Sequence, residues 1–172
     1  MMEKSRMKLT AQDITLIGLM VAVIEVCKLF MKDIPNIELT TFWIMMFTLY
    51  FGKRILFVIP AFILIEGMMF GFGMWWIMYL YLWPLLALVT WLFRKVNSVW
   101  TWATIAGLFG LLFGFFGAIP YIVTSGIYGA FSWWVHGIPW DIVHGIGNFV
   151  IMMVLYRPIR HVMNRVNNML IA

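Results

Sequence analysis

Charged side chains are scarce in this sequence: Asp, Glu, Lys and Arg make up 11% of its 172 residues, whereas 64% are hydrophobic. That balance excludes an ordinary soluble domain and is typical of an integral membrane protein. The length suits one domain that covers the whole chain, 1–172. The net charge of +5 does not indicate nucleic-acid binding, because the basic residues form short clusters between apolar runs rather than one continuous patch.

Cysteine is nearly absent, and several catalytic motifs are missing altogether. The single Cys27 excludes a disulfide framework. The sequence has no G-x-x-x-x-G-K-[ST] motif, so we expect no ATP binding by a P-loop, and it has neither G-x-S-x-G nor H-E-x-x-H. His136, Asp141 and His144 are too loosely spaced to predict a metal site. We therefore expect neither an enzyme nor a bound cofactor, and any solute transport would need energy from another protein.

Six apolar runs are long enough, or nearly so, to cross a bilayer, for which a helix needs roughly 20 apolar residues. They cover about 13–31, 39–51, 55–72, 74–93, 99–124 and 140–156. The sequence before the first run is basic, and no small-residue cleavage site follows that run, so we expect it to be retained as a span. The predicted fold class is an all-α membrane protein of six transmembrane helices.

The basic residues fit this layout, because ten of the 12 Lys and Arg fall on one side of it. These ten are Lys4, Arg6, Lys8, Lys53, Arg54, Arg94, Lys95, Arg157, Arg160 and Arg165. Only Lys28 and Lys32 fall toward the other side. Since cytoplasmic loops carry the excess of Lys and Arg, the pattern predicts that both termini are cytoplasmic.

Ionisable residues within the spans gather in the predicted outer half. Glu25 and Lys28 lie past the middle of the first span, Glu66 near the outer end of the third, and Asp141 and His144 near the start of the last. One-sided clustering of this kind indicates a cavity open to the outside, since ionisable groups within a membrane are usually functional. Glu25 and Lys28 could instead form a local ion pair three residues apart.

The segment 129–158 carries the densest group of candidate residues. Gly137 and Pro139 are expected to break the chain, and Pro139 and Asp141 then suit the first turn of a helix, where proline loses no hydrogen bond and the helix dipole favours negative charge. Asp141, His144 and Asn148 share one face of that helix. Such a polar stripe must face protein, water or a ligand. Asp141 could also be only a helix-start residue.

The predicted outer loops are rich in tryptophan. Trp75 and Trp76 follow the third span, and Trp133 and Trp134 precede the last. These side chains could form an aromatic belt at the membrane interface, or a lid that stacks on a flat ligand.

Small residues form two further patterns. Gly107, Gly110, Gly114 and Gly117 lie on one face of the fifth span, which predicts close helix packing. In the first span, Gly18-x-x-x-Ala22 could pack within the bundle or present a contact face to another membrane protein.

These features occur in an order that resembles the substrate-binding S components of energy-coupling factor (ECF) vitamin transporters. The motifs are TLIGLMVAVI, DIPNIE, a short span ending in FGKR, GFGMWW, D-x-x-H-x-x-G-N and YRP, and together they cover essentially the whole chain. Each motif alone is weak, whereas their order is fairly specific. The resemblance implies a six-helix bundle in the bacterial cytoplasmic membrane that binds a vitamin near its outer face and topples to release it inside.

The resemblance also implies partners and site residues. An S component docks on a transmembrane coupling protein that carries two ATPases, and the docking pattern, alanine-x-x-x-alanine in the family, falls on Gly18 and Ala22. The expected substrate-binding residues are Asn36, Glu38, Glu66, Trp75, Trp76, Trp133, Trp134, His136, Asp141, His144 and Asn148. The ligand expected first is cobalamin, followed by riboflavin and by a pyridoxine-like or pyrimidine compound.

Two other classes of function stay open from the sequence. The chain could be a membrane-embedded enzyme that uses Glu66, Asp141 and His144, although no catalytic pair is evident from their spacing. It could also be a structural or assembly subunit, which would not need an outward polar cluster.

Overall fold

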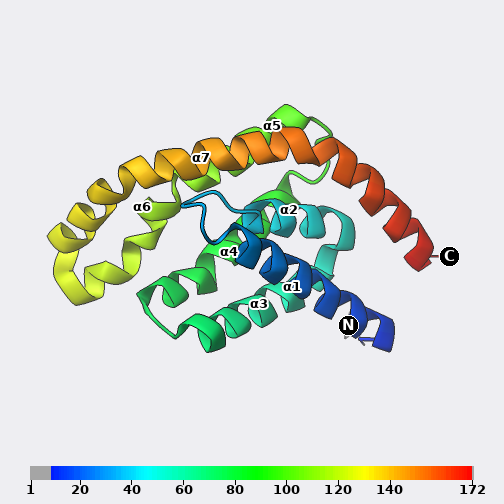
Figure 1. Cartoon of the computed structure of the whole chain (residues 1–172), viewed down its shortest axis with the longest axis horizontal. Helices are drawn as coiled ribbons and strands as arrows, with labels where there is room; N and C mark the ends of the chain where they lie inside the picture. Colours follow the sequence, from blue (N-terminus) through cyan, green and yellow to red (C-terminus); the bar gives the residue numbers. More distant parts are fainter. Residues whose placement is uncertain (1–8, 172) are drawn as a thin grey trace, which may run out of the picture.

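The computed structural model describes residues 9–171, and every regular element in that range is helical. Lys4, Arg6 and Lys8, on which part of the predicted orientation depends, lie outside the described residues. The elements are α1 (Ala11–Met31), α2 (Thr40–Phe51), a short 3₁₀ turn η1 (Gly52–Arg54), α3 (Ile55–Phe70), α4 (Met74–Leu92), α5 (Val99–Leu111), α6 (Phe113–Gly117) and α7 (Ile119–Ile171). Their order is drawn in Figure 1.

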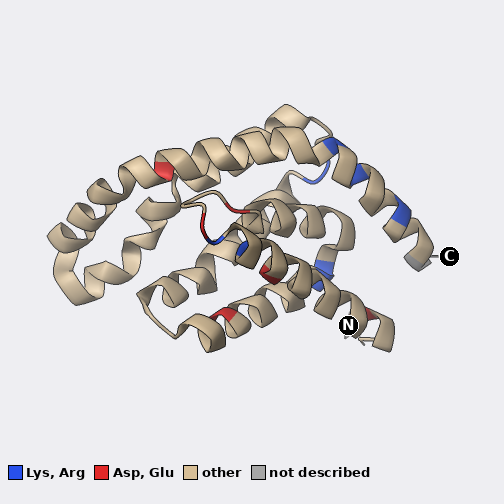
Figure 2. Ribbon diagram, in the orientation of Figure 1, with Lys and Arg blue, Asp and Glu red and all other residues tan. Residues whose placement is uncertain are grey.

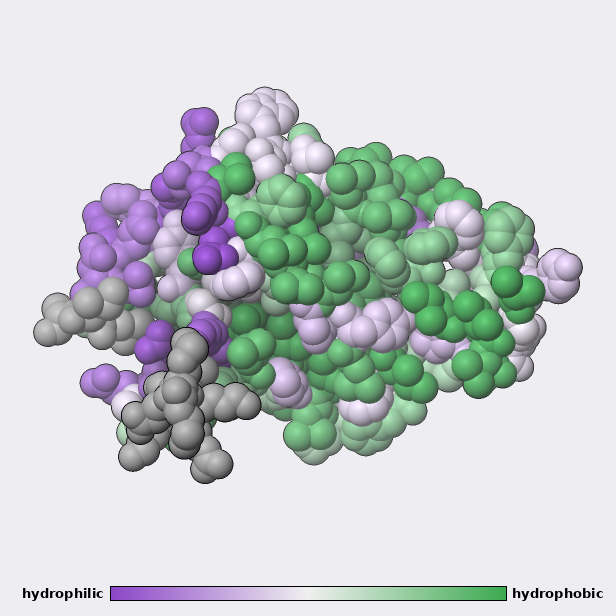
Figure 3. All heavy atoms as spheres, turned by 180° about the vertical axis from the view of Figure 1, so that it is seen from behind, coloured by the Kyte–Doolittle hydropathy of each residue, from purple (hydrophilic) through white to green (hydrophobic). Residues whose placement is uncertain are grey.

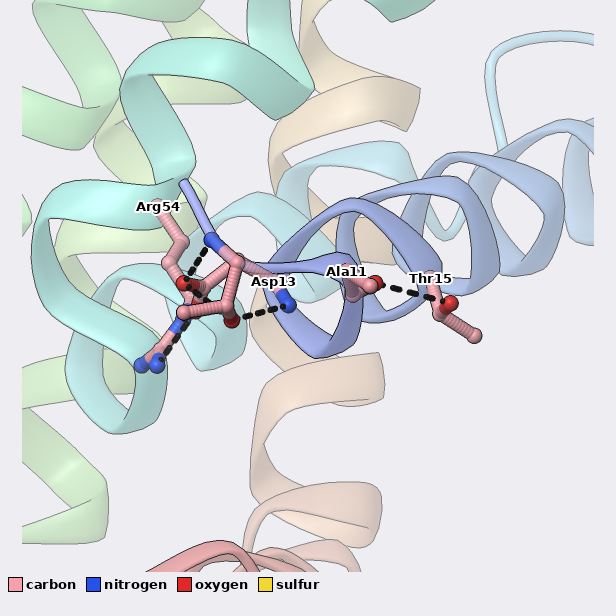
Figure 4. Close-up of polar contacts among 5 residues, drawn as sticks. Ala11, Asp13, Thr15 and Arg54 are labelled. Carbon is pink, nitrogen blue, oxygen red and sulfur yellow. Dashed lines mark hydrogen bonds and ion pairs between the residues drawn. The ribbon is translucent and has the colours of Figure 1, made fainter. Parts of the chain in front are cut away.

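The first helix begins at a capping box that also ties it to η1. The Thr10 hydroxyl accepts a hydrogen bond from the Asp13 amide, and the Asp13 carboxylate accepts one from the Thr10 amide. The same carboxylate pairs with Arg54, whose Nε lies 2.7 Å from Oδ1 (Figure 4). Because the box satisfies two amides that a helix start leaves unpaired, α1 begins where the sequence predicts its first span within about two residues.

Two glycines make the sharp turns between the next helices. Gly52 has φ 54° and separates α2 from α3, and Gly71 has φ 90° and ends α3. Residues with a side chain rarely adopt such angles, so glycine is required at both turns. The predicted boundaries of the second, third and fourth spans agree with α2, α3 and α4 within about two residues.

Helices α1 to α4 form a bundle, and α5 and α7 run side by side along one edge of it (Figure 1). The bundle core is filled by large apolar side chains, including Phe42, Met45, Phe62 and Leu82, all nearly or fully buried. The seam between α5 and α7 is different, because a Cβ added to Gly110 would lie 2.8 Å from the backbone of Gly145. The close packing predicted from the glycines of the fifth span is therefore confirmed.

The prediction of an outer loop before the last span, with a chain break at Gly137 and Pro139, is wrong. The chain breaks at Leu112, continues as α6, and then enters α7, whose single non-helical residue is Gly126 with φ 70° and ψ 177°. Residues 127–171 are one helix, so Gly137, Pro139 and Asp141 lie in its interior rather than at its start. At 1.5 Å per residue this helix is roughly 65 Å long, about twice the thickness of a bilayer core.

The described helices are compatible with a multi-pass membrane protein. Within residues 9–171, four helical segments are long and apolar enough to cross a bilayer: Ala11–Met31, Thr40–Phe70, Met74–Leu92 and Ile119–Met169. The third of these segments agrees with the predicted fourth span, and Thr40–Phe70 contains both α2 and α3. Because α2, α3 and α5 are each shorter than roughly 20 residues, the count of six crossings stays a prediction.

Charge and hydropathy divide the molecule along its length. Most Lys and Arg residues of the described range lie at the end of the molecule where α1 begins and α7 ends (Figure 2), and the surface beyond that end is largely hydrophobic (Figure 3). Below, the two ends are called the basic end and the opposite end. The cytoplasmic position of the basic end remains a prediction from the positive-inside rule.

Candidate functional site

A cavity of about 260 Å³ lies beneath the segment 32–39 that joins α1 to α2, on the side of the α1–α4 bundle away from the basic end (Figure 1). That segment, α1, α4, α6 and α7 all contribute to its wall. The lining residues with polar or aromatic side chains that could contact a ligand are Lys28, Lys32, Asn36, Glu38, Thr40, Tyr79, Trp83, Phe113 and His144. Three of these, Asn36, Glu38 and His144, are among the site residues predicted from the sequence.

Glu38 joins the α1–α2 segment to α7 across this cavity. One of its carboxylate oxygens lies 3.3 Å from Nε2 of His144, and its two oxygens accept hydrogen bonds of 3.0 and 3.1 Å from the Thr41 amide. Burial alone would raise the pKa of Glu38, but the hydrogen bonds from His144 and Thr41 outweigh it and hold the pKa below the ordinary 4.5. Glu38 is therefore an anionic group in the cavity wall at neutral pH.

Asn148 strengthens the same connection one turn further along α7. Its Nδ2 donates to the Thr41 hydroxyl over 3.3 Å, and both side chains are buried. Asn148 does not line the cavity, so it positions the start of α2 rather than contacting a ligand directly. The predicted polar stripe on the last span thus faces protein at Asn148 and the cavity at His144.

A second cavity of about 360 Å³ lies on the other side of Lys28. Its wall includes Glu66, Trp75 and Tyr79, and three residues line both cavities: Lys28, Lys32 and Tyr79. The Lys28 ammonium pairs with a carboxylate oxygen of Glu66 and lies 5.3 Å from the centre of the Tyr79 ring. Two lysines thus lie between the cavities, and Lys28 faces an aromatic ring.

Glu25 does not pair with Lys28, so the local ion pair considered from the sequence is not formed. Glu25 is only 8% exposed, and neither of its carboxylate oxygens has a hydrogen-bond partner. Glu66 is fully buried, and its second oxygen is also without a partner. Two carboxyl groups and one ammonium therefore share a buried region that holds more acceptors than donors, which is a common property of ligand or proton sites.

Asp141 does not start a helix. Its side chain instead bonds to the backbone just after the break between α5 and α6. Its Oδ1 accepts a 2.9 Å hydrogen bond from the Gly114 amide, which has lost its helical partner at the break. A Cβ at Gly114 would lie 2.3 Å from the Asp141 carboxylate, so this contact requires glycine. Asp141 lines neither cavity, which indicates a structural position for this predicted site residue.

The four tryptophans predicted as site residues lie in two different parts of the structure. Trp75 lines the second cavity and meets Tyr79 edge to face at 5.3 Å, while the Trp76 indole donates to the Ile63 carbonyl over 2.8 Å. Trp133 stacks on Tyr121 at 4.7 Å and Trp134 meets Phe115 at 5.2 Å. Neither Trp133 nor Trp134 lines a cavity beside the polar residues.

His136 lies on the same helical stretch as these two tryptophans. Its Nδ1 is 2.7 Å from the carbonyl of Ser132 in its own helix, and its side chain is exposed. It lines neither cavity. Trp133, Trp134 and His136, which the sequence predicted as site residues, thus lie on α7 and apart from the polar group around Glu38 and Lys28.

Sequence reasoning missed Tyr79 and Trp83 and treated Lys28 only as a neighbour of Glu25. Trp75, Tyr79 and Trp83 are spaced four residues apart, which places them on one face of α4. Their rings meet in sequence, with centroids 5.3 and 5.2 Å apart. This i, i+4, i+8 aromatic spacing was the signal that could have identified them.

Within residues 9–171, no group of three or more His, Cys, Asp or Glu side chains is arranged to hold a metal ion. The possible catalytic residues are also separated, because Asp141 bonds to Gly114, His144 to Glu38 and Glu66 to Lys28. The arrangement can bind a small polar and aromatic molecule, with two lysines, a carboxylate and a histidine in the wall of the cavity beneath 32–39. No family model, curated protein or solved structure matches this chain.

Proposed function

We propose that this chain binds a small aromatic vitamin or vitamin precursor in the cavity beneath 32–39, as the S component of an ECF importer. The observation that carries the proposal is the cavity itself, which brings Lys28, Glu38 and His144 together beneath 32–39, on the side of the α1–α4 bundle away from the basic end. If the basic end is cytoplasmic, as the positive-inside rule predicts, the cavity opens toward the outside.

The lining favours a flat ligand with several hydrogen-bonding groups. Tyr79, Trp83 and Phe113 offer ring surfaces, and aromatic pairs contribute about 0.5–1.5 kcal/mol beyond the burial of area. The volume of about 260 Å³ is slightly below the range of roughly 300–1,000 Å³ typical of ligand pockets. It therefore supports a single-ring compound, pyridoxine-like or a pyrimidine, ahead of riboflavin and of the much larger cobalamin.

The chain would depend on partners for energy. Its sequence has no P-loop, so the proposal assigns ATP hydrolysis to two ATPase subunits bound to a transmembrane coupling protein. Gly18 and Ala22 are exposed on α1, and a Cβ at Gly18 would meet no atom within 4 Å. This small-residue face does not pack within the chain, which supports its use in docking on the coupling protein.

Ligand binding by the purified chain tests the first half of this proposal. Equilibrium binding of pyridoxine, a hydroxymethylpyrimidine, riboflavin and cobalamin should be measured in detergent on monodisperse protein. We expect one single-ring compound to bind with the highest affinity and Glu38→Gln to weaken it. The absence of binding by all four, or equal affinity of the parent and Glu38→Gln, would contradict the proposed site.

Uptake and co-purification test the second half. The parent chain co-expressed with a coupling protein and its two ATPases should co-purify with them and support ATP-dependent accumulation of the bound compound. If the chain binds the compound but neither co-purifies with the coupling protein nor supports uptake, it is a binding protein outside the ECF class.

A further inference from the structure

A separate apolar groove of about 370 Å³ lies toward the basic end, between α2–η1 and the helices α3 and α4. It shares no residue with the two cavities around Lys28. Its apolar wall is formed mainly by Leu56, Ile59, Pro60, Pro84, Ala87 and Leu88, and Trp91 stands at its edge. The groove is therefore a different feature from the proposed ligand site.

The groove opens on the outer surface of the bundle rather than into its core. Leu56, Leu88 and Trp91 are 64%, 53% and 47% exposed. Pro60 on α3 and Pro84 on α4 both line it, and their short rigid rings leave the space between the two helices unfilled. In a membrane this surface faces hydrocarbon, so an acyl chain is the natural occupant of the groove.

The charge at the groove indicates which lipid it suits. Lys53 is its one charged lining residue, and it makes no ion pair with any residue in the described range 9–171. The neighbouring Arg54 is already occupied by Asp13. The guanidinium of Arg94 lies 4.0 Å from the ring centre of Trp91, which adds a second cation beside the same wall. An anionic headgroup is thus complementary to the groove.

We propose that this groove binds one acyl chain of an anionic phospholipid, with Lys53 holding the lipid phosphate. The apolar wall excludes water from the chain, and the free ammonium selects a negatively charged headgroup over a zwitterionic one. Basic residues next to a membrane attract anionic lipid by about 1 kcal/mol each. Loss of Lys53 should therefore weaken binding about fivefold.

Phosphatidylglycerol and phosphatidylcholine with identical acyl chains are the probes. Binding of each lipid to the purified chain in neutral detergent is measured by native mass spectrometry across a lipid titration. Lys53→Gln tests the headgroup contact, and Ala87→Leu, which fills the groove, tests the acyl-chain contact. Lys95→Gln is the matched control, because it removes the same charge at the same end without touching the groove.

We expect the parent and Lys95→Gln to prefer phosphatidylglycerol. Lys53→Gln should lose that preference, and Ala87→Leu should weaken binding of both lipids. Equal effects of Lys53→Gln and Lys95→Gln, or unchanged lipid binding by both Lys53→Gln and Ala87→Leu, would overturn the proposal in favour of unspecific lipid contact. If the parent chain is a dimer in the same spectra and Ala87→Leu is a monomer, the groove is an interface between two copies of the chain and the proposal is overturned.

Discussion

Lys28 on α1 pairs with Glu66 on α3, and not with Glu25 three residues before it in the same helix. The pair joins two helices and leaves both oxygens of Glu25 without partners. The two glutamates therefore have different structural roles, although both are buried in the same region.

The first prediction separates those roles. Glu66→Gln removes the negative charge that pairs with the Lys28 ammonium. The Lys28 side chain is 28% exposed, so water compensates for only part of that loss. We expect a loss of about 3 kcal/mol, the lower end of the cost of breaking a buried pair. Glu25→Gln breaks no ion pair and should change stability by less than about 1 kcal/mol. Thermal unfolding in detergent measures both, and equal losses would contradict this assignment.

The second prediction concerns the contact between Glu38 and His144. If both side chains hold the same ligand, Glu38→Gln and His144→Ala should each weaken binding about tenfold, because a charge-assisted hydrogen bond contributes about 1.5–3 kcal/mol. The double variant should lose less than the product of the two effects, since the residues contact each other. Trp134→Ala, which lies outside both cavities, is the control and should bind like the parent.

The third prediction is a pH dependence at Glu38. Its pKa in the folded chain lies below its ordinary 4.5, so the carboxylate stabilises the fold above that pH, and the contribution is lost as the pH falls through the folded pKa. The difference in melting temperature between the parent and Glu38→Gln should be constant at near-neutral pH and shrink below about pH 4.5. A difference that grows on acidification would have the wrong sign.

The fourth prediction concerns the small-residue face of α1. Gly18→Val with Ala22→Leu adds bulk on an exposed surface, so the fold and ligand binding should persist. Close helix approach by a coupling protein should be blocked, and uptake and co-purification should be lost. Normal uptake by the double variant would show that docking uses another surface.

The fifth prediction uses two glycines with opposite surroundings. Gly110→Ala forces a methyl group against the backbone of Gly145 and should destabilise the chain by about 1–3 kcal/mol. Gly137→Ala places the same group in open space within α7 and should be neutral or stabilise by about 0.5–1 kcal/mol. Their melting temperatures should move in opposite directions relative to the parent.

The sequence predicted helices α1 to α4 closely, because apolar runs separated by charged or glycine-containing turns have few other structures available in a membrane. It failed at 125–139, where Gly137 and Pro139 indicated a chain break. A proline in a helix interior removes one hydrogen bond, whereas a loop would leave many backbone groups unpaired in apolar surroundings. The helix therefore continues through both residues.

The candidate site was predicted in part. Depth along each helix, which follows from residue counting, predicted Glu66 and His144 in the outer half, and that placement stays a prediction. In the structure His144 lines the cavity beneath 32–39 and Glu66 lines the second cavity. The partners were not predictable, because the pairing of Lys28 with Glu66 depends on which helices are neighbours in space. The segment 32–39 contributed Asn36 and Glu38 to the cavity, and its fold over α4 and α7 leaves no periodic pattern in the sequence.

The backbone contact between Gly110 and Gly145 has a mechanical consequence. Helices that touch without intervening side chains cannot slide or rotate past each other easily, so α5 and α7 should move as one stiff body. The cavity wall combines His144 of this body, and Phe113 of α6 that packs on α7, with Tyr79 and Trp83 from the α1–α4 bundle. Any change in the volume of the cavity must then come from rocking of one body against the other, or from lifting of the segment 32–39.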